Sequence, residues 1–176
     1  MQLLHLARRL GRAEDGVAAI EMSLVGAIFC LGLLNVSEIA RYGFDSMQAT
    51  AATQAGAEAA LATCDVAHVP ATTNCAGLNN AVATALQSTS LGTQVALKVP
   101  LSEAYYCLDN GGALTFVGSA AATPPADCSA VNNATSVPTL YLVVSTSFTY
   151  APMFGGLTVV DRLPQTMTHT AWMRMK

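Results

Sequence analysis

The sequence has few charged side chains for its length. Of its 176 residues, 8 are Lys or Arg and 11 are Asp or Glu, so 11% are charged. Ordinary soluble domains carry about 25%, and the mean hydropathy here is +0.42. A chain of this length corresponds to about one domain, and part of its apolar surface is expected to face lipid or a partner protein.

The sequence also has no basic stripe beyond its N-terminus. The formal net charge is −3, and the basic residues cluster only at Arg8, Arg9 and Arg12. Nucleic-acid binding requires a run or face of Lys and Arg that neutralises phosphates. The composition therefore excludes a nucleic acid as partner.

Residues suited to catalysis or metal binding are scarce. The histidines are His5, His68 and His169, and none has a neighbour that suggests a nucleophile and base pair. Cys64 and His68 could share a helical face, but no C-x-x-C motif and no second histidine complete a metal site. We therefore expect no enzymatic activity, no metal and no cofactor.

One long apolar run begins near the N-terminus. From Val17 to Val36 the only polar residues are Glu21, Ser23 and Asn35. About 20 helical residues match the ~30 Å hydrocarbon core of a bilayer. Basic residues are concentrated before this run, with only Arg41 just after it, which predicts a single span with the N-terminus in the cytoplasm and the rest outside.

A cleaved secretory signal peptide is an alternative interpretation of this run. Its apolar core usually has about 7–15 residues and ends at small residues before the cut. The run here is longer, and a cut after Ala40 would place Glu38 three residues before the bond. Both features disfavour a secretory signal peptide.

Glu21 is the unusual residue of the run. A carboxylate central in a lipid-facing helix costs roughly 2.5–3.5 kcal/mol, so it usually has a partner. Cleavage after Gly16 would create an α-amino cation on Val17, one helical turn away. At ~4 Å and an effective dielectric of ~20, that pair attracts by roughly 4 kcal/mol before desolvation. Alternatively, Glu21 lies near the interface and reaches the headgroups.

Type IV prepilins share a processing pattern. In it, a basic leader ends in glycine and is followed by an apolar helix with glutamate at its fifth position. Within that class, the chain resembles the TadE-like family of minor pilins, or pseudopilins, of tight-adherence pilus systems. The resemblance lies in "GVAAIEMSLVGAIF" and "SEIARYGFDSMQATAATQAGAEAA", and in the C-terminal "LYLVVSTSFTYAPMFGGL" and "TMTHTAWMRMK". The middle, roughly residues 65–138, is less recognisable.

The resemblance implies a leader at 1–16, a transmembrane helix at 17–40 and an exported pilin-like head at 41–176. A prepilin peptidase would cut after Gly16, and Val17 and Glu21 would act in assembly. The implied partners are other pilins or pseudopilins and the assembly machinery of the bacterial inner membrane. The periplasmic head would help to initiate or cap a type IVc-like pilus, in which the protein could itself be incorporated.

Two features favour a minor component over the main pilin of such a fibre. Met22 follows the glutamate where the major pilins usually carry tyrosine, and the chain is much longer than those pilins. The alternative hypothesis is an unprocessed single-span envelope protein whose periplasmic head is an interaction module.

The fold expected is α+β, a long N-terminal helix with a small antiparallel sheet. No proline occurs from Glu38 to Cys64, which predicts one helix from near Val17 to near Ala62. Its outer half should pack under the sheet through Phe44, Met47, Ala51, Ala55, Glu58 and Ala62. Leu78, Val82 and Leu86 predict a short helix, and strands are expected at 93–99 and 103–108. Two further strand faces are Leu140, Leu142, Val144, Phe148 and Tyr150, and Met167, Ala171 and Met173.

Four of the five cysteines fall in the predicted exported part. Cys64, Cys75, Cys107 and Cys128 are compatible with two disulfides in an oxidising compartment, and Cys30 lies in the span. Three pairings are possible. Local loop closure favours Cys64 with Cys75 and Cys107 with Cys128.

Overall fold

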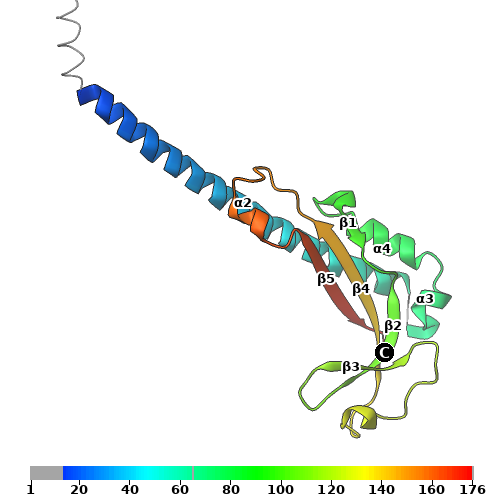
Figure 1. Cartoon of the computed structure of the whole chain (residues 1–176). Coiled ribbons are helices and arrows are strands. Elements are labelled where there is room, and N and C mark those ends of the chain that lie inside the picture. The colour runs from blue at the N-terminus through cyan, green and yellow to red at the C-terminus, as the bar shows by residue number, and fades with distance from the viewer. Residues whose placement is uncertain (1–13, 65, 176) are drawn as a thin grey trace, which may run out of the picture. The chain divides into compact units, whose positions relative to one another are not determined.

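A single long helix dominates the N-terminal part of the chain. The computed structural model describes residues 14–64 and 66–175. Its helix α2 (Glu14–Thr63) has 50 residues (Figure 1). Alanine recurs along its second half and no proline interrupts it, so the sequence favours uninterrupted helix. The predicted helix from near Val17 to near Ala62 is confirmed.

The chain divides into two compact units. The helix unit comprises α2 up to Tyr42 together with Pro152–Leu163. The sheet unit comprises Gly43–Ala151 and the chain from Pro164 onward. Each unit is described by itself below.

The sheet unit contains five antiparallel strands. The longest strand, β4, pairs with β5 along one edge, while β1 and β2 pair with successive parts of its other edge. β3 then pairs with β2. The expected small antiparallel sheet beside a long helix is therefore present. The strands are β1 (Val95–Leu97), β2 (Ser102–Leu108), β3 (Leu114–Ser119), β4 (Thr139–Thr149) and β5 (Thr166–Arg174).

The core of the sheet unit lies on one face of β4. The alternation predicted from the sequence is confirmed, because every second residue is buried: Leu140, Leu142, Val144, Thr146, Phe148 and Tyr150. Thr146 is the polar member of this face. Its hydroxyl lies 2.6 Å from that of Thr53 on α2, which itself donates to the carbonyl of Ala49 at 2.7 Å. Thr146 is therefore the donor, and a buried hydroxyl pair joins the helix to the sheet without an unsatisfied oxygen.

The face that α2 presents to this core differs from the prediction. Phe44, Met47 and Glu58 are exposed, so the predicted packing face is wrong. The buried positions of the outer half are small instead: Ala49, Ala52, Thr53, Gly56, Ala57 and Ala60. Small side chains let neighbouring elements approach the helix backbone closely, whereas large ones would hold them away.

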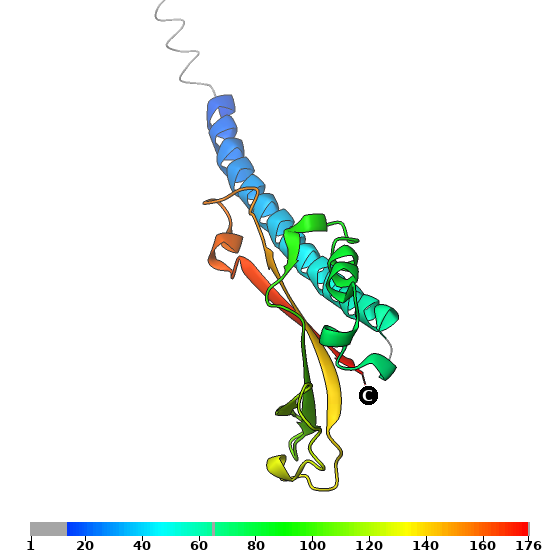
Figure 2. The same cartoon turned by 90° about the vertical axis from the view of Figure 1, so that its right-hand side faces the viewer.

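Helix α4 (Leu78–Leu86) uses this close approach. Its predicted apolar face is confirmed, because Leu78, Val82 and Leu86 are buried. A Cβ atom built on Gly56 of α2 would lie 2.9 Å from Cδ2 of Leu86 and 3.4 Å from Cγ1 of Val82. Figure 2 shows α4 beside the outer half of α2. Gly56 thus fixes how closely the two helices pack.

The remaining elements are short. A four-residue helix, α3 (Ala71–Asn74), precedes α4. Single 3₁₀ turns connect the larger elements. They are η1 (Val66–His68), η2 (Gly92–Gln94), η3 (Ser129–Val131) and η4 (Val159–Arg162).

Two glycines of α2 are expected to respond oppositely to alanine. Gly43 is exposed and an added Cβ meets nothing within 4 Å, so Gly43→Ala should raise the free energy of unfolding by about 0.5–1 kcal/mol. Gly56→Ala forces Leu86 to move and should cancel or reverse that gain, while Gly56→Leu should cost about 1–3 kcal/mol or more. Chemical denaturation of the full chain in detergent measures all three. Equal stabilisation by both alanine variants would contradict the close packing.

Candidate functional site

The residues predicted for processing and assembly lie in the first turns of α2. Gly16, Val17 and Glu21 are all exposed, and Val17 has 60% of its surface accessible. An added Cβ on Gly16 would meet nothing within 4 Å. The structure thus places the three on one accessible helical segment. The leader arginines Arg8, Arg9 and Arg12 lie outside the described residues.

The helix that carries these residues is long and apolar enough to cross a membrane, by length and composition. Its most apolar window has a mean hydropathy of 2.2, and none of that window is buried inside the protein. The exposed apolar side chains occur on all sides of the helix, because they fall at many different spacings: Val17, Ile20, Met22, Leu24, Val25, Ile28, Phe29, Leu31, Leu33 and Val36. A helix that is apolar all round belongs in an apolar environment.

Two polar side chains near the end of the apolar run hold a distant loop. Oδ1 of Asn35 accepts a hydrogen bond from the backbone N–H of Val159 at 2.9 Å. Oε1 of Glu38 accepts one from the N–H of Met153 at 2.8 Å. The i,i+3 spacing of Glu38 and Arg41 predicts a pair on the surface, but only 1% of Glu38 is accessible, so the predicted surface position of this glutamate is wrong. Within the helix unit, the segment Pro152–Leu163, orange in Figure 1, is therefore bound to α2.

The loop itself is closed by internal bonds. Oδ2 of Asp161 accepts from the N–H of Gly156 at 2.6 Å, and Gly156 has a φ of 81°, which favours glycine. Val160 is fully buried and Thr158 is nearly so. The segment is thus an ordered attachment of the helix unit.

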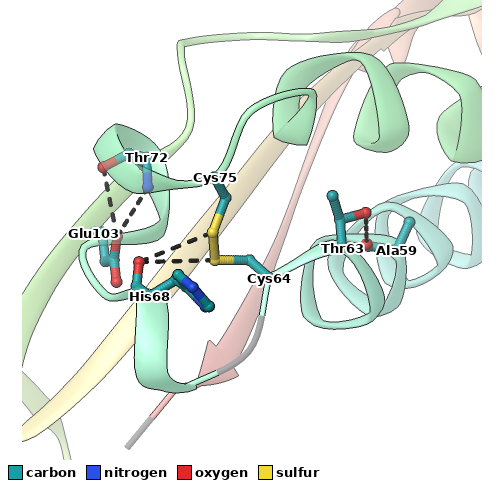
Figure 3. The surroundings of a disulfide bond; sticks show 7 residues. All are labelled: Ala59, Thr63, Cys64, His68, Thr72, Cys75 and Glu103. Atoms are coloured by element: carbon teal, nitrogen blue, oxygen red, sulfur yellow. Dashed lines mark hydrogen bonds between the residues drawn. A yellow bond between two sulfur atoms is a disulfide. The ribbon is translucent and has the colours of Figure 1, made fainter.

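In the sheet unit, a disulfide joins Cys64 and Cys75, with their Cα atoms 5.7 Å apart. This bridge ties the residue after α2 to the segment between α3 and α4 (Figure 3). The carbonyl oxygen of His68 lies 3.9 Å and 3.8 Å from the two sulfurs. Closing such a loop contributes about 3 kcal/mol in the chain-entropy model.

A buried carboxylate lies near this bridge. Glu103 of β2 is 9% accessible, and its Oε2 accepts from the N–H and the hydroxyl of Thr72 at 3.2 and 3.4 Å (Figure 3). Thr72 lies in the first turn of α3, where backbone N–H groups lack helical partners. Glu103 thus connects α3 to the sheet.

The second disulfide joins Cys107 of β2 to Cys128 in the long loop before β4. Side chains add to it, because Asn133 Nδ2 donates to the carbonyl of Leu108 at 3.0 Å. Beside the bridge, the hydroxyl of Ser129 and then its backbone N–H hold the pKa of Asp127 below its usual range. Both bridges have the pairing that local closure favours. Cys30 is free and exposed.

The two described histidines lie in different elements of the sheet unit, His68 in η1 and His169 in β5. Nδ1 of His169 lies 3.1 Å from the hydroxyl of Thr50, and His68 lies in η1 beside the first disulfide. His5 is outside the described residues. Within residues 14–64 and 66–175, no group of three His, Cys, Asp or Glu side chains could hold a metal ion.

Comparison with protein-family models, with curated proteins and with solved structures finds no match to this chain. Sequence patterns indicated Gly16 and Glu21 but missed the contacts of Asn35 and Glu38. Two features of the sequence could have indicated these contacts. Asn35 and Glu38 are polar residues at i and i+3 where the apolar run ends, and a second apolar stretch, "APMFGGLTVV", follows later in the chain.

The cysteine arrangement predicts how many thiols react. Alkylation of the denatured, unreduced protein from native membranes should label one thiol, Cys30, and labelling after reduction should reach five. Mass spectrometry counts the adducts and locates the bridged peptides. Five labelled thiols without reduction would show that the part of the chain after the span does not reside in an oxidising compartment.

Proposed function

We propose that the protein is a minor pilin, or pseudopilin, that helps to start or cap a tight-adherence pilus. A prepilin peptidase removes residues 1–16, the apolar helix joins a bundle of pilin helices, and the head is displayed outside. The protein is anchored in the bacterial inner membrane, with its N-terminus in the cytoplasm. Its partners are other pilins and the inner-membrane assembly machinery.

The observation that carries this proposal is the position of Glu21. It is exposed on a helix whose neighbouring side chains are apolar and equally exposed, and it lies five residues after Gly16. A carboxylate there has no role in packing the chain's own core. A new amine on Val17, of the same or a neighbouring subunit, would be a suitable partner.

Gly16 weakens the helix at the bond that a prepilin peptidase would cut. Glycine lowers the stability of a helix by about 1 kcal/mol relative to alanine, and Gly16 is exposed. Both properties favour access of a peptidase to this bond.

The alternative is a single-span envelope protein that is never cut and whose head binds another periplasmic component. The apolar helix and the disulfides are compatible with both hypotheses. The two hypotheses differ at Gly16, because only a pilin requires the bond after this residue to be cleaved.

Substitutions at Gly16 and Glu21 should fail at different stages. Gly16→Leu should accumulate uncut, since a large residue blocks the peptidase. Glu21→Gln should be cut normally yet assemble poorly, because it removes the charge that meets the amine of Val17. Glutamine also enters a membrane more easily than glutamate, so poor assembly would not reflect poor insertion. N-terminal mass spectrometry measures processing, and crosslinking to partner pilins with surface fibre counts measures assembly.

Glu58→Gln is the matched control, because Glu58 is an exposed glutamate on the outer half of the same helix. It should leave processing and assembly unchanged. An uncut N-terminus in the wild-type protein would favour the envelope-protein hypothesis. Normal crosslinking and piliation with Glu21→Gln would remove the physical basis of the proposal.

A further inference from the structure

We propose that the loop Pro152–Leu163 lies in the headgroup region of the bilayer, in the leaflet at the C-terminal end of the span. The lipid surface is thus a second contact of the protein, besides the span itself. This inference rests on one part of the proposed function, that α2 crosses a membrane. It does not depend on cleavage after Gly16 or on the role of Glu21.

Two hydrogen bonds hold the loop at the level where the apolar run ends. Val159 is bonded to Asn35 and Met153 to Glu38, and the apolar run ends at Val36. With a rise of ~1.5 Å per residue, both contacts fall within about 5 Å of the end of the run along the helix axis. The polar region of a bilayer extends roughly 5–8 Å beyond the hydrocarbon core on each side. The two bonds therefore place the loop at the boundary between acyl chains and headgroups.

The surface of the loop is apolar. Met153, Leu157 and Val159 have 65%, 62% and 53% of their surfaces accessible. The stretch from Ala151 to Val160 contains no charged residue. In a loop surrounded by water, the outward positions usually carry polar side chains. Here the outward positions are aliphatic or thioether groups, while the polar Thr158 is turned inward.

The loop lies beside exposed apolar side chains of the helix. Val36 and Ile39 of α2 are exposed at the same level as the two hydrogen bonds. The apolar surface of the span therefore continues into the loop. At the end of the loop, Asp161 is engaged with Gly156, and the exposed Arg162 is suited to a lipid phosphate. A shallow apolar insertion with a flanking cation is how peripheral segments bind a membrane surface.

The proposal also accounts for the burial of Glu38. A carboxylate at the level of the headgroups costs free energy if the bilayer strips its water. The N–H of Met153 donates to Glu38, of which only 1% is accessible. A loop seated on the bilayer thus shields the first carboxylate after the span.

The test uses the full chain reconstituted at one copy per lipid nanodisc, so that no neighbouring subunit can cover the loop. Cys30→Ala removes the free thiol, and Val159→Cys supplies a new one for an environment-sensitive fluorophore. The backbone N–H of residue 159 is kept, so the bond to Asn35 is preserved. Lipids that carry a quencher near the top of the acyl chain should reduce the emission about twofold or more, with a blue-shifted maximum.

The matched control is Leu61→Cys, because Leu61 is another exposed aliphatic residue, 38% accessible, on α2 itself, about 37 Å beyond Val36 at ~1.5 Å per residue. Its probe should be quenched little.

A second pair of variants tests the hydrogen bond between Asn35 and Val159. Asn35→Ala removes the acceptor of Val159 and should lower the quenching at residue 159. Ser37→Ala removes only a bond to the carbonyl of Leu34 within the helix and should have no effect.

A water-exposed spectrum at residue 159, or equal quenching at residues 61 and 159, would overturn the proposal. Protection of the residue-159 probe from water that appears only when several copies share one nanodisc would assign the loop to a contact with a neighbouring subunit. That outcome would also overturn the proposal. Intact disulfides and an unchanged unfolding transition show that each variant is folded. Because the experiment involves no peptidase and no fibre, its failure would leave the pilin proposal standing, and the reverse holds as well.

Discussion

The constraint on which the structure depends is that one continuous helix serves two surroundings. The first half of α2 exposes large apolar side chains that no other segment within residues 14–64 and 66–175 covers, and the second half offers small ones to a sheet and to α4. Exchanging the large side chains of the first half for the small ones of the second half would disrupt both halves of the helix. Large residues at the position of Gly56 would push α4 away, and alanines in the span would weaken its transfer into lipid. The change from large to small residues along the helix therefore determines where the protein core begins.

Much of the fold could be predicted because its signals are local. A run without proline predicted α2, four-residue spacing predicted α4, and alternation predicted the buried face of β4. What failed depends on distant partners. The packing face of α2 was wrong because large side chains such as Phe44 and Met47 are usual core residues, whereas this interface selects small ones. The strand predicted at 93–99 is only Val95–Leu97, and β3 was missed because the sequence around it is rich in loop-forming residues.

The candidate site shows the same division. Gly16 and Glu21 stand out in the sequence because they are exceptions within a regular pattern. Asn35 and Glu38 do not, because their partners lie more than a hundred residues later in the chain. Such contacts join the helix to the loop between β4 and β5. No local sequence pattern specifies contacts between segments so far apart in the chain. The favoured disulfide pairing could be chosen because both loops are short, with separations of 11 and 21 residues.

The central position of β4 has a consequence for the order in which the protein matures. β1, β2 and β5 all pair with β4, yet β4 begins only at Thr139. The last bridged cysteine, Cys128, precedes it in the sequence. A chain that emerges from the ribosome N-terminus first therefore presents every cysteine of both bridges before the strand that organises the sheet. Oxidation can precede assembly of the sheet, and the two short loops can close at a stage when the head is still an open chain.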